Sequence, residues 1–222
     1  MTVPQAVIFD CDGVILQSNR LKSDAFGRVL EGYDPAQVAE FLAWHRATGG
    51  VSRFHKFARF FRDVRRAPDW EALTEQACTE FGTLVFEGLK TCATVPGFEA
   101  LVKTLRSNSV ALAVNTGGAE EEVRQVFEAR GLAKDFDYIF GSPATKEHNM
   151  EKLRALGLAM PGAVYFGDSK LDFDLARTFD LRFIYVAYES EWPEGAKTAK
   201  AAGARVIQDF GELAPQGYSL LG

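Results

Sequence analysis

The pattern of hydrophobic and polar residues divides the chain into three stretches. Residues 7–9 form a short apolar run, typical of a fully buried strand in a parallel sheet. From about Asn19 to Gly88 the apolar positions recur at helical spacing. From Thr94 onward apolar strands alternate with amphipathic helices, which indicates a parallel sheet covered on both faces. The expected strands lie at 110–114, 138–140, 163–166, 183–187 and 206–207, the last at a sheet edge, and the expected helices at 98–105, 119–130, 146–156 and 171–178.

The helical stretch interrupts the alternation after its first strand. Its apolar residues form four stripes, with glycine and proline between them, and so predict four helices. The stripes are Ala25, Phe26, Val29 and Leu30; Val38, Phe41, Leu42 and His45; Phe54, Phe57, Ala58 and Phe61; and Trp70, Leu73, Ala77, Phe81 and Leu84. We therefore predict an α/β fold in which a Rossmann-like core, residues 1–16 and 92–222, carries an inserted helical cap domain at 17–91.

Asp10 and Asp12 directly follow the first apolar run, and Gly13 follows them. Ligands of open α/β sheets collect beyond the carboxyl ends of the strands. Two carboxylates this close repel each other unless a cation or a proton intervenes. One interpretation is a metal-assisted site, in which Asp10 is ligand and nucleophile and Asp12 is general acid and base. The other is an ordinary polar turn, since Asp and Gly are common turn residues.

A second acidic pair, Asp168 and Asp172, spans the turn between a later strand and its helix. Mg²⁺ prefers oxygen ligands and keeps several waters. Asp10, Asp168 and one backbone carbonyl would suffice to hold it, with Asp172 supporting these ligands from outside. The alternative is that Asp168 or Asp172 is a helix cap.

Two other strand ends carry polar groups to the same edge. Thr116, Gly117 and Gly118 run into a predicted helix N-terminus, which suits either a phosphate cradle or an ordinary helix start. The acidic residues 120–122 suit the dipole of that helix and need no functional role. Lys146 is poorly placed for the dipole of the helix that it begins. This weakly indicates that it balances a negative charge elsewhere, although most lysines lie on the surface.

Composition restricts the possible partners. Of 222 residues, 47% are hydrophobic and 25% are charged, as in ordinary soluble globular proteins, and the net charge of −5 does not suggest nucleic acid. The N-terminus has no signal-peptide pattern and no apolar run reaches membrane length, so we expect no membrane association. Three cysteines without CxxC spacing suit a reducing cytoplasm. His45, His55 and His148 lack metal-ligand spacing, and we expect them on the surface or in the cap.

The order of these motifs resembles the haloacid dehalogenase-like hydrolase superfamily, in the subgroup with a small helical cap after the first strand. The matching segments are DCDGV at 10–14, AVNTGG at 113–118, Lys146, and GDSKLD at 167–172, and together they extend over the whole chain. Relatives that attack carbon replace the second aspartate of the first segment, so the presence of Asp12 favours phosphate chemistry.

The resemblance implies a role for each motif. Asp10 would form an aspartyl-phosphate, while Asp12 would protonate the leaving oxygen and then activate water. The implied phosphate-binding residues are Thr116, Gly117 and Lys146, and the residues expected around Mg²⁺ are Asp10, Asp12, Asp168 and Asp172. These roles are physically coherent, because phosphoryl transfer depends mainly on positioning and charge neutralisation.

One cap segment bears on the substrate. GVSR at 50–53 is similar to the cap loop of β-phosphoglucomutases, in which the arginine holds the substrate's other phosphate. That family has a histidine at the position of Lys22, and its absence here weakens the mutase prediction. Arg53 and Lys22 are candidate substrate residues, with surface charges as the alternative. We predict a Mg²⁺-dependent phosphatase acting on a small phosphomonoester metabolite; the alternatives are a sugar-phosphate mutase or a non-catalytic binding or regulatory protein.

Overall fold

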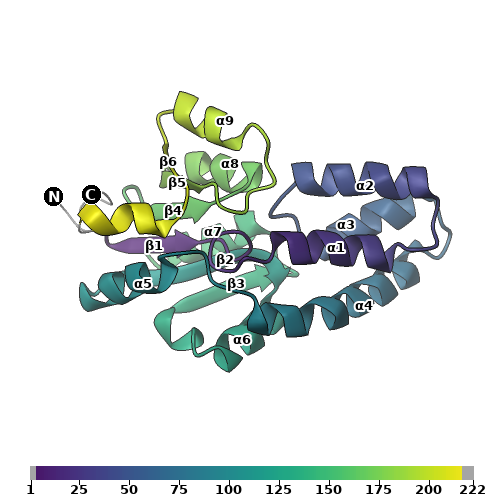
Figure 1. The fold of residues 1–222 in the computed structure, drawn as a ribbon, viewed down its shortest axis with the longest axis horizontal. Helices are drawn as coiled ribbons and strands as arrows, with labels where there is room; N and C mark the ends of the chain where they lie inside the picture. Colours follow the sequence, from purple (N-terminus) through teal and green to yellow (C-terminus); the bar gives the residue numbers. More distant parts are fainter. Residues whose placement is uncertain (1–3, 217–222) are drawn as a thin grey trace.

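The computed structural model describes residues 4–216 and contains a six-stranded parallel sheet with the order β3-β2-β1-β4-β5-β6 (Figure 1). The strands are β1 (Ala6–Phe9), β2 (Ala111–Ala119), β3 (Tyr138–Ser142), β4 (Val164–Gly167), β5 (Arg182–Val186) and β6 (Arg205–Ile207). Phe9 at the end of β1 pairs with Val114 on one side and Phe166 on the other. The predicted α/β fold is confirmed, and β6 is the edge strand that the sequence indicated.

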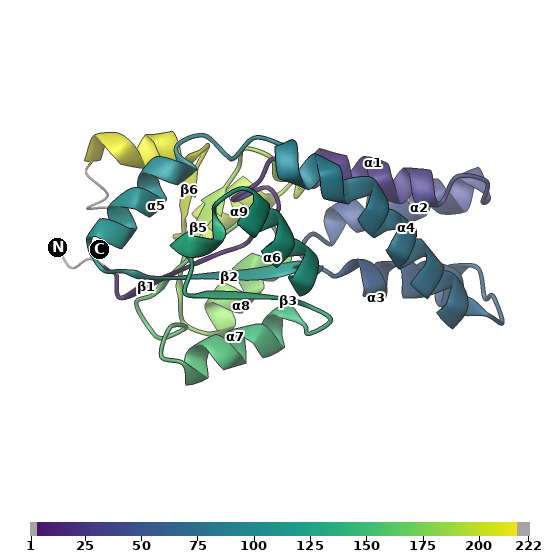
Figure 2. The same ribbon diagram turned by 90° about the horizontal axis from the view of Figure 1, so that it is seen from below.

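Helices cover both faces of the sheet, and the side-chain alternation of β1 divides the core between them. Val7 and Phe9 pack with α5 (Phe98–Ser107) and α6 (Glu120–Ala129). Ala6 and Ile8 pack with the other group of helices. These are α7 (Lys146–Ala155), α8 (Lys170–Thr178) and α9 (Gly195–Ala201), the last of which the sequence pattern did not predict. Figure 2 shows α6 and α7 on opposite sides of the sheet. Two short 3₁₀ segments complete the core, η2 (Ala133–Asp135) and η3 (Phe210–Gln216).

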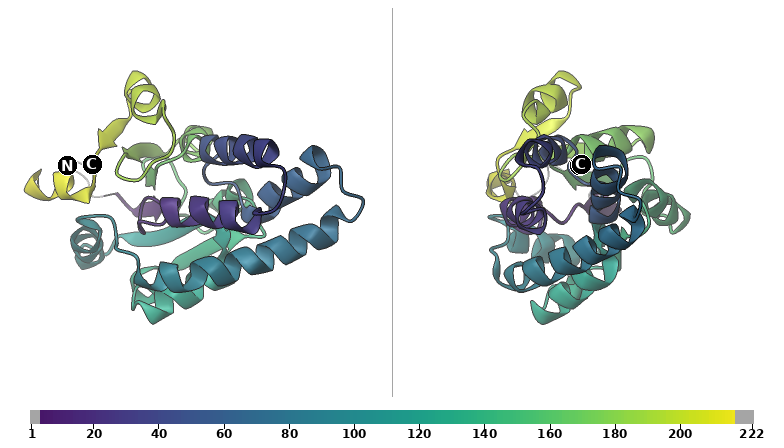
Figure 3. Two further views of the ribbon diagram at one scale, coloured as in Figure 1. Left: turned by 45° about the vertical axis from the view of Figure 1, so that its right-hand side comes forward. Right: turned by 90° about the vertical axis from the view of Figure 1, so that its right-hand side faces the viewer.

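Four helices between β1 and α5 extend beyond one end of the sheet (Figures 1 and 3). They are α1 (Asn19–Val29), α2 (Pro35–Ala47), α3 (Arg53–Ala58) with the π-helical continuation η1 (Arg59–Val64), and α4 (Trp70–Thr91). We call this group the cap. Aromatic rings fill its centre, and the ring centroid of Phe26 lies 4.4 Å from that of Phe81 and 5.0 Å from that of Phe57. The predicted domain boundaries at 17 and 91 stay a prediction.

The third stripe of the cap was predicted incorrectly at one position. Phe54 was placed on the buried face, but it is 37% exposed, whereas Phe60 is fully buried and its ring packs against that of Phe41. η1 follows Phe54 and Phe57, and its wider π-helical turn shifts the residues from Arg59 onward relative to an α-helical pattern. Phe60 and Phe61 therefore both face the cap interior.

β2 is longer than predicted and changes the surroundings of Thr116. The strand was expected to end at residue 114, with a turn at 115–118, but it continues to Ala119, and α6 begins at Glu120. The pairing with β3 shifts register between Asn115 and Ala119, so this end of β2 bends while remaining extended. Gly117 and Gly118 thus lie in a strand end rather than at the start of a helix.

Among residues 4–216, no helix has the length and apolar character that a membrane span requires.

Candidate active site

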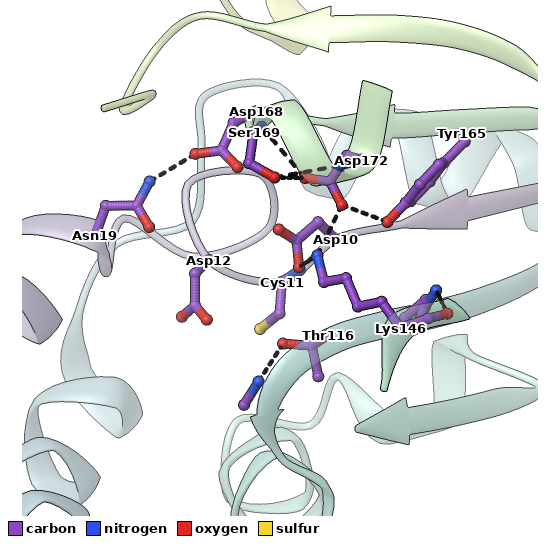
Figure 4. Close-up of polar contacts among 12 residues, drawn as sticks. Asp10, Cys11, Asp12, Asn19, Thr116, Lys146, Tyr165, Asp168, Ser169 and Asp172 are labelled. Atoms are coloured by element: carbon purple, nitrogen blue, oxygen red, sulfur yellow. Dashed lines mark hydrogen bonds and ion pairs between the residues drawn. The ribbon is translucent and has the colours of Figure 1, made fainter. Parts of the chain in front are cut away.

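Three carboxylates meet at the edge of the sheet that faces the cap (Figure 4). Asp10 follows β1, Asp168 follows β4, and Asp172 lies in the first turn of α8. β1 and β4 are neighbours in the sheet, so their carboxyl ends bring Asp10 and Asp168 together. Oxygens of all three side chains lie within 4.8 Å of one another, and all three residues are buried.

Burial and mutual repulsion disfavour negative charge on this cluster. Burial raises the pKa of Asp10 to about 7, Lys146 opposes the rise, and Asp172 and Asp12 add to it. The pKa of Asp168 also lies well above its usual range, because the side chain is buried and faces Asp10 and Asp172. The protein groups around this cluster thus stabilise the ionised forms of Asp10 and Asp168 only in part.

Lys146, the first residue of α7, is the buried cation of this cluster. Its Nζ lies 2.8 Å from Asp10 Oδ1 and 2.8 Å from Asp172 Oδ1. Burial by itself would lower the pKa of Lys146, but the two carboxylates outweigh it and raise the pKa above its ordinary value. Lys146 therefore balances negative charge from other elements, as its unfavourable place at a helix start indicated; its role in phosphate binding stays a prediction.

Several hydrogen bonds fix the carboxylate of Asp172. Ser169 and Asp172 form a capping box at the start of α8, with Ser169 Oγ 2.6 Å from Asp172 Oδ2. The hydroxyl of Tyr165 donates a hydrogen bond to Asp172 Oδ1, the oxygen that also contacts Lys146. The N-cap residue is therefore Ser169 rather than Asp168 or Asp172, and Asp172 takes part both in the capping box and in the acidic cluster. Asn19, which no sequence pattern singled out, donates from Nδ2 to Asp168 Oδ2 at 2.6 Å.

Asp12 lies apart from the other acids (Figure 4). Its carboxylate accepts hydrogen bonds from Ser18 Oγ and Lys22 Nζ, each at 2.6 Å. Burial alone would raise the pKa of Asp12, but Lys22 and Ser18 outweigh burial and hold it below the usual value. Of the four acids predicted around the metal, the structure brings three carboxylates together and directs the fourth, Asp12, toward Lys22.

Thr116 and Gly117 lie where the core meets the cap. Thr116 is fully buried, and its Oγ1 accepts a hydrogen bond of 3.0 Å from the backbone N–H of Gly118. A Cβ atom on Gly117 would overlap the carbonyl group of Gly50 in the turn between α2 and α3. Gly50 has a φ of +80°, and a Cβ there would lie 3.3 Å from Lys146 Nζ. The turn between α2 and α3 thus contacts the sheet edge that carries the acidic cluster. Glycine at 50 and 117 permits this close approach.

The cap and the core enclose a cavity of about 70 Å³, with room for about five water-sized spheres. The core contributes Asp10, Asp12 and Asp168 to its wall. The cap contributes four cationic side chains, Lys22, Arg46, Arg53 and Lys56. Both cap residues predicted to contact the substrate, Lys22 and Arg53, therefore line the cavity that contains the acidic cluster.

Arg53 reaches from the cap to the core. Its Nη1 lies 2.9 Å from Oε2 of Glu122 in α6, and its guanidinium group lies 5.3 Å from the ring centroid of Phe81. Its Nε is buried and has no hydrogen-bond partner in the described part of the chain. Glu122 was expected to serve only the helix dipole, but it also lines the cavity and binds the cap.

His45 lies in the cap, as expected, on α2, and it is buried rather than exposed. It is 7% exposed and lines the cavity with Lys56, and its Nε2 contacts Ser23, which in turn hydrogen-bonds to Glu191 of the core. These residues come from three cap helices and the segment after β5, so no local sequence pattern could connect them. The helical stripe of α2 did include His45, and this was the one available signal that it is buried.

The profile of the haloacid dehalogenase-like hydrolases matches residues 7–186. The chain belongs to this family. A phosphoglycolate phosphatase of Rhodospirillum rubrum is 28% identical to it over 95% of this chain and 90% of the relative. Its name agrees with the predicted class, a phosphoric monoester hydrolase.

Solved structures support the same fold. A structure described as a predicted phosphoglycolate phosphatase from Haemophilus somnus superposes with a TM-score of 0.76 at 18% identity, over 97% of this chain and 98% of the other. CbbY from Rhodobacter sphaeroides, solved with phosphate, has a TM-score of 0.71 at 26% identity, over 95% and 96% of the two chains. A mutant of CbbY has also been solved with xylulose-1,5-bisphosphate.

Proposed function

We propose that the protein is a Mg²⁺-dependent phosphatase that hydrolyses a small phosphomonoester through an aspartyl-phosphate on Asp10. One observation carries the proposal. Asp10 is buried beside Lys146 and Asp168, whereas Asp12 lies apart from them at the same sheet edge and pairs with Lys22. Two carboxylates in such different environments can perform different tasks. The alternative of a non-catalytic protein is disfavoured, because none of these groups has been replaced.

Asp10 acts as the nucleophile in this proposal. Its Oδ1 is fixed by Lys146 Nζ at 2.8 Å and by the backbone N–H of Cys11 at 2.6 Å. A carboxylate held in one orientation attacks without first having to be ordered. The positive charge of Lys146 also reduces the repulsion between Asp10 and a phosphate dianion. Thr116 and Gly117, from the neighbouring strand, complete the proposed phosphate site with Lys146.

Asp12 acts as the acid and then as the base. Its pKa lies below the ordinary range while it contacts Lys22 and Ser18, so it is ionised before substrate binds. The negative charge of an arriving phosphate raises the pKa of a nearby carboxyl, which favours the protonated form that the leaving oxygen requires. After the alcohol departs, Asp12 is ionised again and can accept a proton from water.

The acidic cluster fits Mg²⁺. Its donors are all carboxylate oxygens, which Mg²⁺ prefers, and the raised pKa values of Asp10 and Asp168 indicate that the protein alone stabilises their ionised forms incompletely. Asp10 and Asp168 would hold the ion, and Asp172 and Asn19 would support them. When bound, the ion supplies positive charge against the phosphoryl oxygens.

The cavity favours a substrate with a second anionic group. Phosphoglycolate, named for the Rhodospirillum relative, carries a carboxylate, and xylulose-1,5-bisphosphate, bound by the CbbY mutant, carries a second phosphate. The small cavity favours a compact ester. Arg53, with its unpartnered Nε, and Lys22 are proposed to contact the substrate from the cap. A mutase is less well supported, because Lys22 replaces the histidine of that family and is already paired with Asp12.

Release of inorganic phosphate from a panel of phosphorylated metabolites tests the proposal. The panel should include 2-phosphoglycolate, sugar monophosphates and sugar bisphosphates, each with Mg²⁺ and with chelator. We expect Mg²⁺-dependent release from at least one compact ester, and none from it by Asp10→Asn. Transfer of the phosphoryl group between sugar hydroxyls without its release would support the mutase instead.

A further inference from the structure

The four cations that the cap contributes to the cavity differ in how their charge is balanced. Three have a carboxylate oxygen nearby: Lys22 with Asp12 at 2.6 Å, Arg53 with Glu122 at 2.9 Å, and Arg46 with Glu191 at 4.0 Å. Among the described residues, Lys56 has no carboxylate oxygen within 4.0 Å, although it is only 2% exposed. An ammonium group buried without a counterion is energetically costly, so the presence of Lys56 in this cavity requires a physical reason.

A chain of hydrogen bonds fixes the position of Lys56. Its Nζ donates to His45 Nδ1 at 2.7 Å and to the His45 carbonyl at 3.2 Å. An ammonium group has only donors, so Nδ1 accepts and the ring proton lies on Nε2. Nε2 then donates to Ser23 Oγ at 2.9 Å, and the Ser23 hydroxyl donates to Glu191 Oε2 at 2.9 Å.

These hydrogen bonds leave one N–H of the Lys56 ammonium group without an acceptor among the described residues. An ammonium group has three N–H bonds, and the described residues accept two of them. Both nitrogens of His45 are already occupied, so the imidazole cannot take a substrate group itself. Two hydrogen bonds thus hold Lys56 at the cavity wall, and in its protonated form one N–H has no acceptor among the described residues.

We propose that Lys56 binds the second anionic group of the substrate, a carboxylate or a second phosphate, while the transferring phosphate lies at Asp10. The inference rests on the proposed phosphatase function and assigns the end of the substrate that does not react. The anion would supply the counterion that the protein does not, and a charge-assisted hydrogen bond of this kind is strong.

The competing explanation is purely structural. Lys56 also caps the carbonyl of His45 near the end of α2, and this bond alone could retain it. The two explanations differ in one observable. A structural lysine affects all substrates equally, whereas an anion-binding lysine affects those that carry the second anion.

Two matched esters separate these explanations. In 2-hydroxyethyl phosphate a hydroxymethyl group replaces the carboxylate of 2-phosphoglycolate, and the phosphate end is unchanged. The readout is the ratio of kcat/KM for 2-phosphoglycolate to kcat/KM for 2-hydroxyethyl phosphate. Lys56→Met should lower this ratio ~10–100-fold, mainly through KM for 2-phosphoglycolate, as expected for a lost charge-assisted hydrogen bond. Lys56→Arg should recover part of it, and the control Lys90→Met, on the cap helix α4, should leave it unchanged.

A second pair, xylulose-1,5-bisphosphate and xylulose 5-phosphate, identifies which anion is bound. If the second anion is a phosphate, Lys56→Met abolishes the preference for the bisphosphate. If it is a carboxylate, the loss is confined to the phosphoglycolate pair.

The inference is overturned if Lys56→Met leaves the ratio unchanged for both pairs of esters. It is also overturned if the ratio falls in Arg53→Met but not in Lys56→Met. A wild-type enzyme that hydrolyses phosphomonoesters without preferring a second anion also overturns it and leaves the proposed function standing. If wild type hydrolyses no phosphomonoester, both fail. Thermal melting shows whether Lys56→Met folds; if it does not, Lys56→Gln is measured in its place.

Discussion

Lys146 and Asp10 form an ion pair of 2.8 Å in which both side chains are almost completely buried. The pair joins the end of β1 to the start of α7, so one contact fixes the proposed nucleophile and neutralises part of its charge. Removing one member of a buried pair leaves the other without compensation.

Lys146→Met should therefore lower both stability and activity. In metal-free protein the free energy of unfolding should fall by about 3–5 kcal/mol, and Mg²⁺ should recover part of the loss by replacing the missing positive charge. Urea unfolding with and without Mg²⁺ measures this. Lys103→Met, at an exposed position of α5, is the control. Equal stability of Lys146→Met and wild type would contradict the assigned charge balance.

Mg²⁺ should stabilise the protein as well as activate it. Because binding to the folded state raises stability, the melting temperature should rise with Mg²⁺ concentration and return to its metal-free value with chelator. Asp168→Asn should lose most of this rise, since it removes one proposed ligand and keeps the shape of the side chain. A rise of the same size in Asp168→Asn would place the metal elsewhere.

Gly117→Ala should impair catalysis on every ester. The added methyl group would overlap the carbonyl of Gly50 and hold the cap turn away from the catalytic edge. A displacement of about 1 Å near the reacting groups can cost about 10²-fold, and we expect a loss of this order in kcat/KM. Gly27→Ala, in α1, meets only Leu42 at 3.7 Å and should retain nearly full activity. Full activity of Gly117→Ala would show that this close approach is unnecessary.

The burial of Lys56 should be visible in the pH dependence of stability. Burial lowers its pKa from 10.5 to about 7. Between these values the unfolded chain binds more protons than the folded one, so the contribution of Lys56 to stability rises with pH across this window. The charged and titratable groups that influence its pKa or contact it are Glu191, Lys22, Asp12, Lys146 and His45. Lys56→Met keeps all of these and removes only the lysine.

The comparison of wild type with Lys56→Met isolates this contribution. Measured by urea unfolding at about pH 6 and about pH 9, wild type should gain stability relative to the variant as the pH rises. Parallel changes in the two proteins would mean that Lys56 keeps an ordinary pKa.

The sequence was most informative where local pattern and sheet topology lead to the same conclusion. The apolar runs before Asp10 and before Asp168 predict buried parallel strands, and such strands place their carboxyl ends at one edge. The two acidic pairs could therefore be expected to meet there. The edge strand β6 and the alternation of strands and helices followed from the same reasoning.

Other features depend on tertiary contacts that no local pattern contains. His45 is buried because Ser23 and Lys56, from two other helices, satisfy its ring nitrogens. Phe60 and Phe61 are both buried in a π-helical turn that the α-helical spacing did not predict. Glu122 contacts Arg53 across 69 positions of sequence, and from the sequence it could only be interpreted through its own helix.

In the proposed mechanism Asp10 carries the phosphoryl group during turnover. The most direct test mixes wild type with its best substrate and Mg²⁺, quenches with acid within the first turnover and analyses the peptides by mass spectrometry. The account predicts the added mass of one phosphoryl group on the peptide that contains Asp10, and neither this label nor turnover in Asp10→Asn. A phosphoryl group on another residue, or undiminished turnover by Asp10→Asn, would contradict it.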